Sequence, residues 1–420
     1  MHQKTTLDNG LRVITATMPH TRSVSISIFI GAGSRYEADS QAGVSHFIEH
    51  LMFKGTPRRT TARDISVAIE GLGGIINAGT DKELTVYWCK VAQQHFSLAL
   101  DVLADIVLHS KFDPSDIENE RRVIIEEIHM GKDSPSQLVN ILIDELLWPD
   151  HPLGRDIAGD KDSVAGISRD MMLDYLACQY QPGNTVVSIA GALKHREMVT
   201  AVNGALGGWA KREPRPGYQA YKERPFPRLN VERKDTEQVH LCLGLNGLPL
   251  LHPRRFVLDL LNVILGEGMS SRLFTKIRDR LGLAYSIHSY TDHFLDTGAI
   301  TVYAGVEPKN LPVAIKAILE QLSLLKEPVP EDELVKAKEL AKGRLLLRME
   351  DSRSVAGWMG GQEILTGKVL SVDQVTSILD AITAEELGQL ARELLVDSQL
   401  RLAVVGPVAE DEPLDEMLKL

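Results

Sequence analysis

The chain has 420 residues, which is too long for one ordinary hydrophobic core and suits two or three domains. Its composition, 44% hydrophobic and 25% charged, is that of a folded protein rather than a disordered one. With 46 Lys and Arg against 57 Asp and Glu, the net charge is −11 and both halves are acidic, which argues against a nucleic-acid-binding protein. No apolar run approaches the ~18 residues that a membrane-spanning helix requires.

The first residues contain no apolar segment of the signal-peptide type, so we expect a cytoplasmic protein without a membrane span. The three cysteines, Cys89, Cys178 and Cys242, are far apart and odd in number. This spacing argues against both a disulfide scaffold and a thiolate zinc site. We expect each cysteine to be a small buried hydrophobic side chain.

The clearest change in composition lies at residues 211–228. This segment contains four prolines, mixed charges and no sustained helix or strand pattern. Such a segment suits an exposed and fairly stiff connector between domains. We therefore predict a first domain at residues 1–212, a linker at 213–228 and a second domain at 229–420.

Three strand-like segments of the first half recur in the second half in the same order. The pairs are residues 24–28 with 239–243, 186–191 with 401–406, and 85–87 with 301–303. The residue numbers of the first two pairs differ by one constant offset, and those of the third pair differ by one more. The shared order and nearly constant offset predict a duplicated domain of about 210 residues.

Longer helical stretches alternate with these strands. They cover residues 43–53, 62–72, 96–108, 117–130 and 136–147 in the first half, and 256–266, 311–325 and 331–349 in the second. We predict an α+β fold of two homologous domains, each an α/β sandwich in which helices pack on a mostly antiparallel sheet. Gly360 and Gly361 lie in a further helical region, where the pattern does not decide between a break and a hinge.

One segment of the first half has the spacing of a metal site. His46 and His50 are four residues apart, so on a helix both imidazoles lie on one face and can reach one ion. Glu49 lies beside that face, where its carboxylate can accept a proton from a water activated by zinc. The alternative is two core histidines and a surface glutamate that share a helix by chance, so the motif needs support from a third ligand.

The third ligand is expected in the helical stretch 117–130. Glu120 and Glu127 are seven residues apart and share a helix face, whereas Glu126 points about 100° away from Glu127. One inward carboxylate can bind the metal while the other orients a ligand histidine. Periodicity alone does not choose between Glu126 and Glu127.

These motifs resemble the inverted-zincin metallopeptidases of the pitrilysin/insulysin type, the M16 family, in which His-x-x-Glu-His reverses the commoner zincin order. In size and layout the chain is most similar to β-type subunits of mitochondrial processing peptidase and to short bacterial processing peptidases. The resemblance covers nearly the whole chain and rests on residues 46–56, 77–78, 118–128, 151–155 and 180–191. It implies that His46, His50 and Glu127 are zinc ligands, that Glu49 is the general base and that Glu120 is a supporting catalytic acid.

The resemblance also implies residues that bind substrate. Asn77 and Ala78 resemble the edge strand to which substrate backbones add in this family. Residues 265–274 resemble its glycine-containing substrate loop. Arg278 and Tyr285 look like the pair that holds the substrate carbonyl and backbone, a role that suits a guanidinium and a phenol facing a developing oxyanion.

The second half has lost the metal motif, because the offset of the first two pairs places Leu261 and Leu265 at the positions of His46 and His50. One chain therefore has one zinc site and one Arg/Tyr pair, which in two-subunit relatives are divided between chains. We infer a homodimer, and the sequence leaves open whether the pair acts in cis or in trans.

The sequence predicts a zinc metalloendopeptidase with one Zn²⁺ per chain, which acts on peptides or unfolded polypeptide segments. Two alternatives remain. The chain could be a non-catalytic structural or assembly subunit of the same family. It could also be a processing peptidase that needs a separate partner chain.

Overall fold

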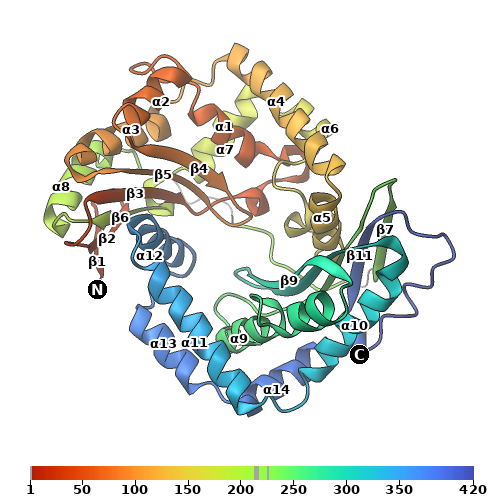
Figure 1. Ribbon diagram of the computed structural model, residues 1–420. Coiled ribbons are helices and arrows are strands. Elements are labelled where there is room, and N and C mark those ends of the chain that lie inside the picture. Colours follow the sequence, from red (N-terminus) through yellow and green to blue (C-terminus); the bar gives the residue numbers. More distant parts are fainter. Residues whose placement is uncertain (1, 212–216, 225–226) are drawn as a thin grey trace. The chain divides into compact units, whose positions relative to one another are not determined.

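The computed structural model describes residues 2–211, 217–224 and 227–420 (Figure 1). Residues 213–216 and 225–226 of the predicted linker lie outside the described residues. The chain forms two compact units: residues 1–128, 156–219 and 346–371 belong to unit 1, and residues 129–155, 220–345 and 372–420 belong to unit 2. Each unit thus combines most of one half of the sequence with a segment from the other half.

Unit 1 is built on a six-stranded sheet of order β1-β2-β6-β3-β5-β4, in which only the β2–β6 pairing is parallel. Its strands are β1 (His2–Thr6), β2 (Arg12–Thr17), β3 (Ser23–Ile30), β4 (Ile75–Thr80), β5 (Thr85–Ala92) and β6 (Thr185–Gly191). Its helices are α1 (Val44–Met52), α2 (Ala62–Glu70), α3 (Phe96–His109), most of α4 (Pro114–Asp133), α6 (Lys161–Gly166), α7 (Arg169–Gln179), α8 (His195–Leu206) and α12 (Ser352–Thr366).

Unit 2 is built on a five-stranded sheet of order β7-β11-β8-β10-β9, in which only the β7–β11 pairing is parallel. Its strands are β7 (Leu229–Arg233), β8 (Val239–Asn246), β9 (Ala284–His293), β10 (Gly298–Val306) and β11 (Arg401–Gly406). Its helices are α5 (Pro135–Leu147), α9 (Arg255–Gly266), a π-helix (Phe274–Arg280), α10 (Leu311–Leu324), most of α11 (Glu331–Arg348), α13 (Val372–Ala381) and α14 (Ala384–Leu394).

Equivalent strands pair in the same way in the two units, as the predicted repeat requires. In unit 1 Ile26 lies opposite Ile189, and in unit 2 Leu241 lies opposite Val404, so both partners are displaced by the same offset in residue number. The α+β fold with mostly antiparallel sheets is confirmed.

One detail of the predicted repeat is wrong. Phe29 pairs with Val86 in unit 1, and Gly244 pairs with Thr301 in unit 2, so Val86 rather than Thr85 corresponds to Thr301, at the same offset as the other strands. A slip of one residue reverses the face on which a side chain lies. Accordingly, Tyr87 packs in the main core of unit 1, whereas Tyr303 packs on the sheet face that α5 covers.

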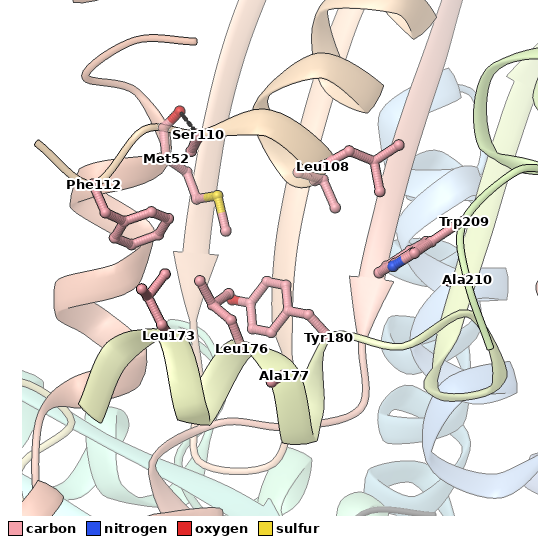
Figure 2. Close-up of a pocket in the computed structure, with 11 residues that line it drawn as sticks. Met52, Leu108, Ser110, Phe112, Leu173, Leu176, Ala177, Tyr180, Trp209 and Ala210 are labelled. Atoms are coloured by element: carbon pink, nitrogen blue, oxygen red, sulfur yellow. Dashed lines mark hydrogen bonds between the residues drawn. The ribbon is translucent and has the colours of Figure 1, made fainter. Parts of the chain in front are cut away.

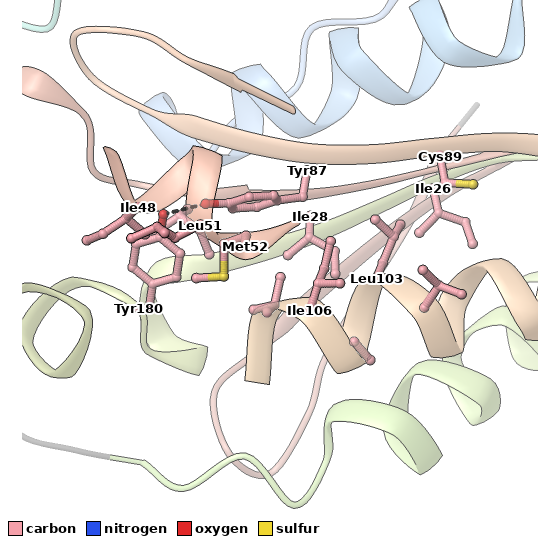
Figure 3. Packing of buried hydrophobic residues seen from close by; sticks show 14 of the residues in the cluster. Ile26, Ile28, Ile48, Leu51, Met52, Tyr87, Cys89, Leu103, Ile106 and Tyr180 are labelled. Carbon is pink, nitrogen blue, oxygen red and sulfur yellow. Dashed lines mark hydrogen bonds between the residues drawn. The ribbon is translucent and has the colours of Figure 1, made fainter. Parts of the chain in front are cut away.

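The main core of unit 1 lies between the sheet and helices that include α1 and α3. Figure 3 shows Ile26 and Ile28 of β3 facing Leu103 and Ile106 of α3, with the Tyr87 and Tyr180 hydroxyls hydrogen-bonded to each other. α1 is amphipathic and buries five apolar side chains in this core: Val44, Phe47, Ile48, Leu51 and Met52. Burial of that face fixes the rotation of α1, and therefore the direction in which its polar residues point.

The second sheet face of each unit is covered by a helix from the other half of the sequence. α5 packs on β8 and β11 of unit 2, and α12 packs on β2, β3 and β6 of unit 1. α12 runs without interruption through Gly360 and Gly361. At Gly360 a Cβ atom would lie 2.2 Å from the Phe29 ring, so the absence of a side chain allows close packing on β3.

Two further expectations can be compared with the structure. Cys89 and Cys242 are buried as expected, but Cys178 is exposed on α7, because it lies on the outer side of that helix. Among the described residues, no helix combines the length and the apolar character needed to cross a bilayer.

Candidate metal centre

The two motif histidines share one face of α1. Their ring centroids lie 4.6 Å apart at an interplanar angle of 69°, and their side chains are 14% (His46) and 21% (His50) exposed. They therefore lie at the surface of the unit 1 core, with their ring nitrogens able to face a common ligand.

The start of α1 is held by a carboxylate that sequence reasoning missed. Buried Glu37 accepts hydrogen bonds from the backbone N–H groups of Gly43 and Ser45, each at 2.8 Å. A carboxylate at a helix N-terminus satisfies unpaired N–H groups and complements the helix dipole. The Ser45 hydroxyl also donates to the Tyr175 hydroxyl at 2.8 Å. These contacts fix α1 at the end that precedes the histidines.

The Glu127 carboxylate of α4 meets both histidines. Its Oε2 atom is 3.9 Å from Nε2 of His46 and 3.7 Å from Nε2 of His50. The candidate donor atoms of these three residues lie within 4.8 Å of one another, and they form the one such group of three or more found among the described residues. Glu126 is not part of this group. The structure thus brings together the three residues that the family pattern singles out.

The chemistry of this donor set fits zinc, which favours two imidazole nitrogens and a carboxylate with a fourth position left open. Burial lowers the pKa of His46 to about 4, and the neighbouring His50 contributes to the same shift against the opposing effect of Asp156. His46 is therefore neutral near pH 7, the form in which an imidazole binds a metal. Its Nδ1 atom is buried without a hydrogen-bond partner among the described residues.

His50 differs from His46 in the environment of Nδ1. This atom lies 3.1 Å from Oε2 of Glu120, whose side chain is 10% exposed. A carboxylate in this position can accept a hydrogen bond from the Nδ1–H group and leave Nε2 available for a metal. Glu120 is thus placed for a supporting role rather than as one of the three donor atoms.

Glu49 lies next to the donor set without belonging to it. Its Oε2 atom accepts a hydrogen bond from the hydroxyl of Thr80, a residue of β4 that the sequence analysis did not single out. Burial raises the pKa of Glu49, and the Thr80 hydrogen bond opposes this effect. A carboxylate with a raised pKa is a stronger proton acceptor than an ordinary glutamate.

Asn77 and Ala78 lie on β4, which forms one edge of the sheet and pairs with β5 alone among the described strands. The Ala78 N–H group donates to Oδ1 of Asn77 at 2.8 Å. β4 also packs beside α1. The predicted substrate strand is therefore an edge strand, and it passes next to the helix that carries the histidines.

Arg278 and Tyr285 meet within unit 2. The Arg278 guanidinium lies 4.7 Å from the centroid of the Tyr285 ring, a cation–π contact. Tyr285 is 78% exposed and lies at an irregularity of the β9–β10 pairing, where Gly305 pairs with Ser286 and Val306 with Ala284. Bulges of this kind redirect a side chain out of the sheet pattern.

The helix that corresponds to α1 in unit 2 is α9. Leu261 and Leu265 of α9 are buried and have no group that could bind a metal. In the second copy this helix is therefore a core helix without metal ligands.

A cavity of about 430 Å³ lies on another side of α1, where Met52 forms part of its wall (Figure 2). Its remaining lining is mostly apolar and aromatic and includes Phe112, Leu176, Tyr180 and Trp209. No histidine, aspartate or glutamate is among the described residues that line it, so these residues do not supply metal ligands or a carboxylate base.

Two family models match successive parts of the chain. Residues 12–161 match a family model described as insulinase (peptidase family M16), and residues 166–340 match one described as peptidase M16 inactive domain. The chain is 36% identical over 408 residues to the uncharacterized zinc protease YmxG of Bacillus subtilis (strain 168), covering 97% of this chain and 98% of that protein.

Solved structures share the fold. A protease from Helicobacter pylori has a TM-score of 0.92 at 23% identity, covering 97% of this chain and 99% of that chain. A peptidase M16 inactive domain from Pseudomonas fluorescens has a TM-score of 0.90 at 18% identity, covering 98% and 100%. At these identities the likeness concerns the fold alone.

Proposed function

This chain belongs to the insulinase family of peptidases, peptidase family M16, and we propose that it is a zinc metalloendopeptidase that hydrolyses peptides or unfolded polypeptide segments. The observation that carries this proposal is the convergence of His46, His50 and Glu127, with Glu49 beside them.

In this proposal His46, His50 and Glu127 hold one Zn²⁺. When bound, the ion lowers the pKa of water and polarises a carbonyl group. Glu49 accepts the proton that the attacking water loses and passes it to the leaving amine, a role that its raised pKa supports.

Other residues of the chain bind the substrate. The free edge of β4 at Asn77 and Ala78 offers backbone groups to an extended peptide, which favours unfolded segments over folded proteins. Arg278 and Tyr285 donate hydrogen bonds to the substrate backbone and to the negative charge that develops on the carbonyl oxygen. Processing of precursor peptides is one form that this activity could take.

The direct test is the Glu49→Gln variant, which keeps the shape of the side chain and removes its basicity. It should bind about one zinc per chain and cleave an unstructured fluorogenic peptide roughly 10²–10⁴-fold more slowly. Glu70→Gln, at an exposed position at the end of α2, is the matched control and should behave like the wild type. Cleavage by Glu49→Gln at a rate close to that of the wild type would exclude the mechanism.

A non-catalytic assembly subunit is the second candidate. It is favoured by the match of residues 166–340 to a model described as an inactive domain. Full zinc occupancy without cleavage of any of a varied set of peptides would support this candidate over the peptidase.

A further inference from the structure

Lys54 lies four residues after His50, just beyond the end of α1. Its backbone N–H donates to the Leu51 carbonyl at 3.1 Å, so the chain is still turning there and the side chain stays near the histidine face. Its Nζ atom lies 2.6 Å from Oε1 of Glu120. The other oxygen of that carboxylate, Oε2, faces Nδ1 of His50 at 3.1 Å. One carboxylate thus connects Lys54 to His50.

The burial of Glu120 explains why a cation is needed. Its side chain is 10% exposed, whereas that of Lys54 is 31% exposed. A buried carboxylate is costly unless all of its oxygens have partners, and a charged donor is the strongest partner available. Without Lys54, Oε1 would lose this partner and the carboxylate could rotate away from His50.

The two histidines are not supported equally. Nδ1 of His46 is buried without a hydrogen-bond partner among the described residues, whereas Nδ1 of His50 faces Glu120. The contact between Lys54 and Glu120 therefore acts on one of the two imidazoles, and His50 is the one whose orientation depends on polar contacts.

We propose that Lys54 is a positioning residue for the metal centre: its ammonium group holds the Glu120 carboxylate in the orientation that directs Nε2 of His50 towards the ion. This inference rests on the proposed function, because it concerns how firmly the predicted zinc ligands are oriented. Residues that orient a metal ligand without binding the metal themselves contribute about 10–100-fold to metal affinity.

The test is zinc affinity, measured by competition with a chromophoric chelator. Lys54→Met keeps the length of the side chain and removes its charge, and it should bind Zn²⁺ about 10–100-fold more weakly than the wild type. Lys54→Arg retains a cation and should recover most of the affinity. The visible absorption bands of the Co²⁺-substituted protein should shift in Lys54→Met and return towards the wild-type spectrum in Lys54→Arg.

Lys342→Met is the matched control. Lys342 lies 2.7 Å from both Glu339 and Asp380 in unit 2, so its loss also breaks ion pairs but should leave zinc affinity unchanged. Glu120→Gln provides a second route to the answer. If Lys54 acts through Glu120, the double variant Lys54→Met/Glu120→Gln should lose little more zinc affinity than the single variant that binds zinc more weakly. If the two residues acted independently, the losses of the single variants would multiply.

The outcomes separate this inference from the proposed function. If the wild type binds one zinc and folded Lys54→Met binds it equally tightly with an unchanged Co²⁺ spectrum, the role of Lys54 is refuted and the metal centre stands. If Lys54→Met does not fold, Lys54→Gln takes its place, and a folded Lys54→Gln that binds zinc as tightly as the wild type refutes the role. If the wild type binds no zinc, the proposed function fails and this inference fails with it.

Discussion

His46 and His50 lie one helical turn apart on α1, yet they differ in how the protein prepares them. Burial keeps His46 neutral, and its pKa of about 4 lies well below that of an ordinary histidine. His50 is instead oriented by Glu120. A neutral, partly buried imidazole and an oriented one both suit metal binding.

The first prediction concerns the stability of the metal-free protein at acidic pH. Because the pKa of His46 is about 4 in the folded state and 6.5 in an unfolded chain, the unfolded state binds an additional proton between these values. Stability should therefore fall as the pH drops below about 6.5, by about 2 kcal/mol between pH 7 and pH 5 from this residue. Urea unfolding of wild type and His46→Gln over this range measures the effect. Parallel pH profiles of the two proteins would contradict it.

The second prediction separates Glu127 from Glu126. Glu127→Gln should weaken zinc binding by more than about 100-fold, because a residue that binds the metal directly contributes more than one that only orients a ligand. Glu126→Gln should change it by less than about twofold, since Glu126 lies outside the donor group. Isothermal titration of both variants with Zn²⁺ measures the difference. The reverse order of affinities would assign the third ligand to Glu126.

At the residue scale, the sequence predicts those site residues that lie on one helix. The spacing of His46 and His50 determines their common face once α1 forms. Periodicity could not choose between Glu126 and Glu127, because the rotation of α4 depends on how it packs against the unit 1 core. Glu37 and Thr80 could not be predicted either. Their contacts with α1 are made from a loop and from an edge strand, whose positions no local pattern specifies.

At the scale of elements, α12 is the helix whose position is most informative. It comes from the second half of the sequence and covers one face of the unit 1 sheet. Its buried Glu363 pairs with Lys4 at 2.6 Å and with Arg12 at 3.0 Å, and its Ser352 hydroxyl lies 2.9 Å from that of Ser25. Unit 1, which contains the predicted zinc ligands, is therefore completed by a distant segment of the chain.

The third prediction uses two adjacent glycines of α12. Gly360→Ala would place its Cβ 2.2 Å from the Phe29 ring and should destabilise the protein by about 1–3 kcal/mol. Gly361→Ala meets no atom within 4 Å and should stabilise the helix by up to about 1 kcal/mol. Chemical denaturation of both variants tests the packing of α12. Equal effects at the two positions would show that α12 does not pack on β3 as described.

The sequence predicts the existence of these elements better than their partners. Predicted and observed helices agree closely, as with residues 96–108 for α3 and 311–325 for α10, because their apolar periodicity is strong. That α5 packs on the unit 2 sheet and α12 on the unit 1 sheet could not be predicted, since an amphipathic helix can cover either sheet. The one-residue error at Thr301 has a similar origin: local similarity does not determine register, which depends on pairing across the sheet.

At the scale of the whole molecule, one chain contains two copies of a fold with one metal-type motif. The copy that lost the motif retains Arg278 and Tyr285 in contact with each other. The fourth prediction is that the active form is a homodimer, in which every zinc site is served by such a pair. Light scattering should give twice the 46.4 kDa of one chain. A fully active monomer, or activity that appears only with a different partner chain, would contradict this prediction.

We propose that His46, His50 and Glu127 hold one zinc ion. Anomalous diffraction at the zinc edge, from crystals of the zinc-loaded protein, locates that ion. We expect one anomalous peak per chain, at roughly 2.0–2.2 Å from Nε2 of each histidine and from the Glu127 carboxylate. A peak held by other residues, or none at saturating zinc, would rule out this ligand set.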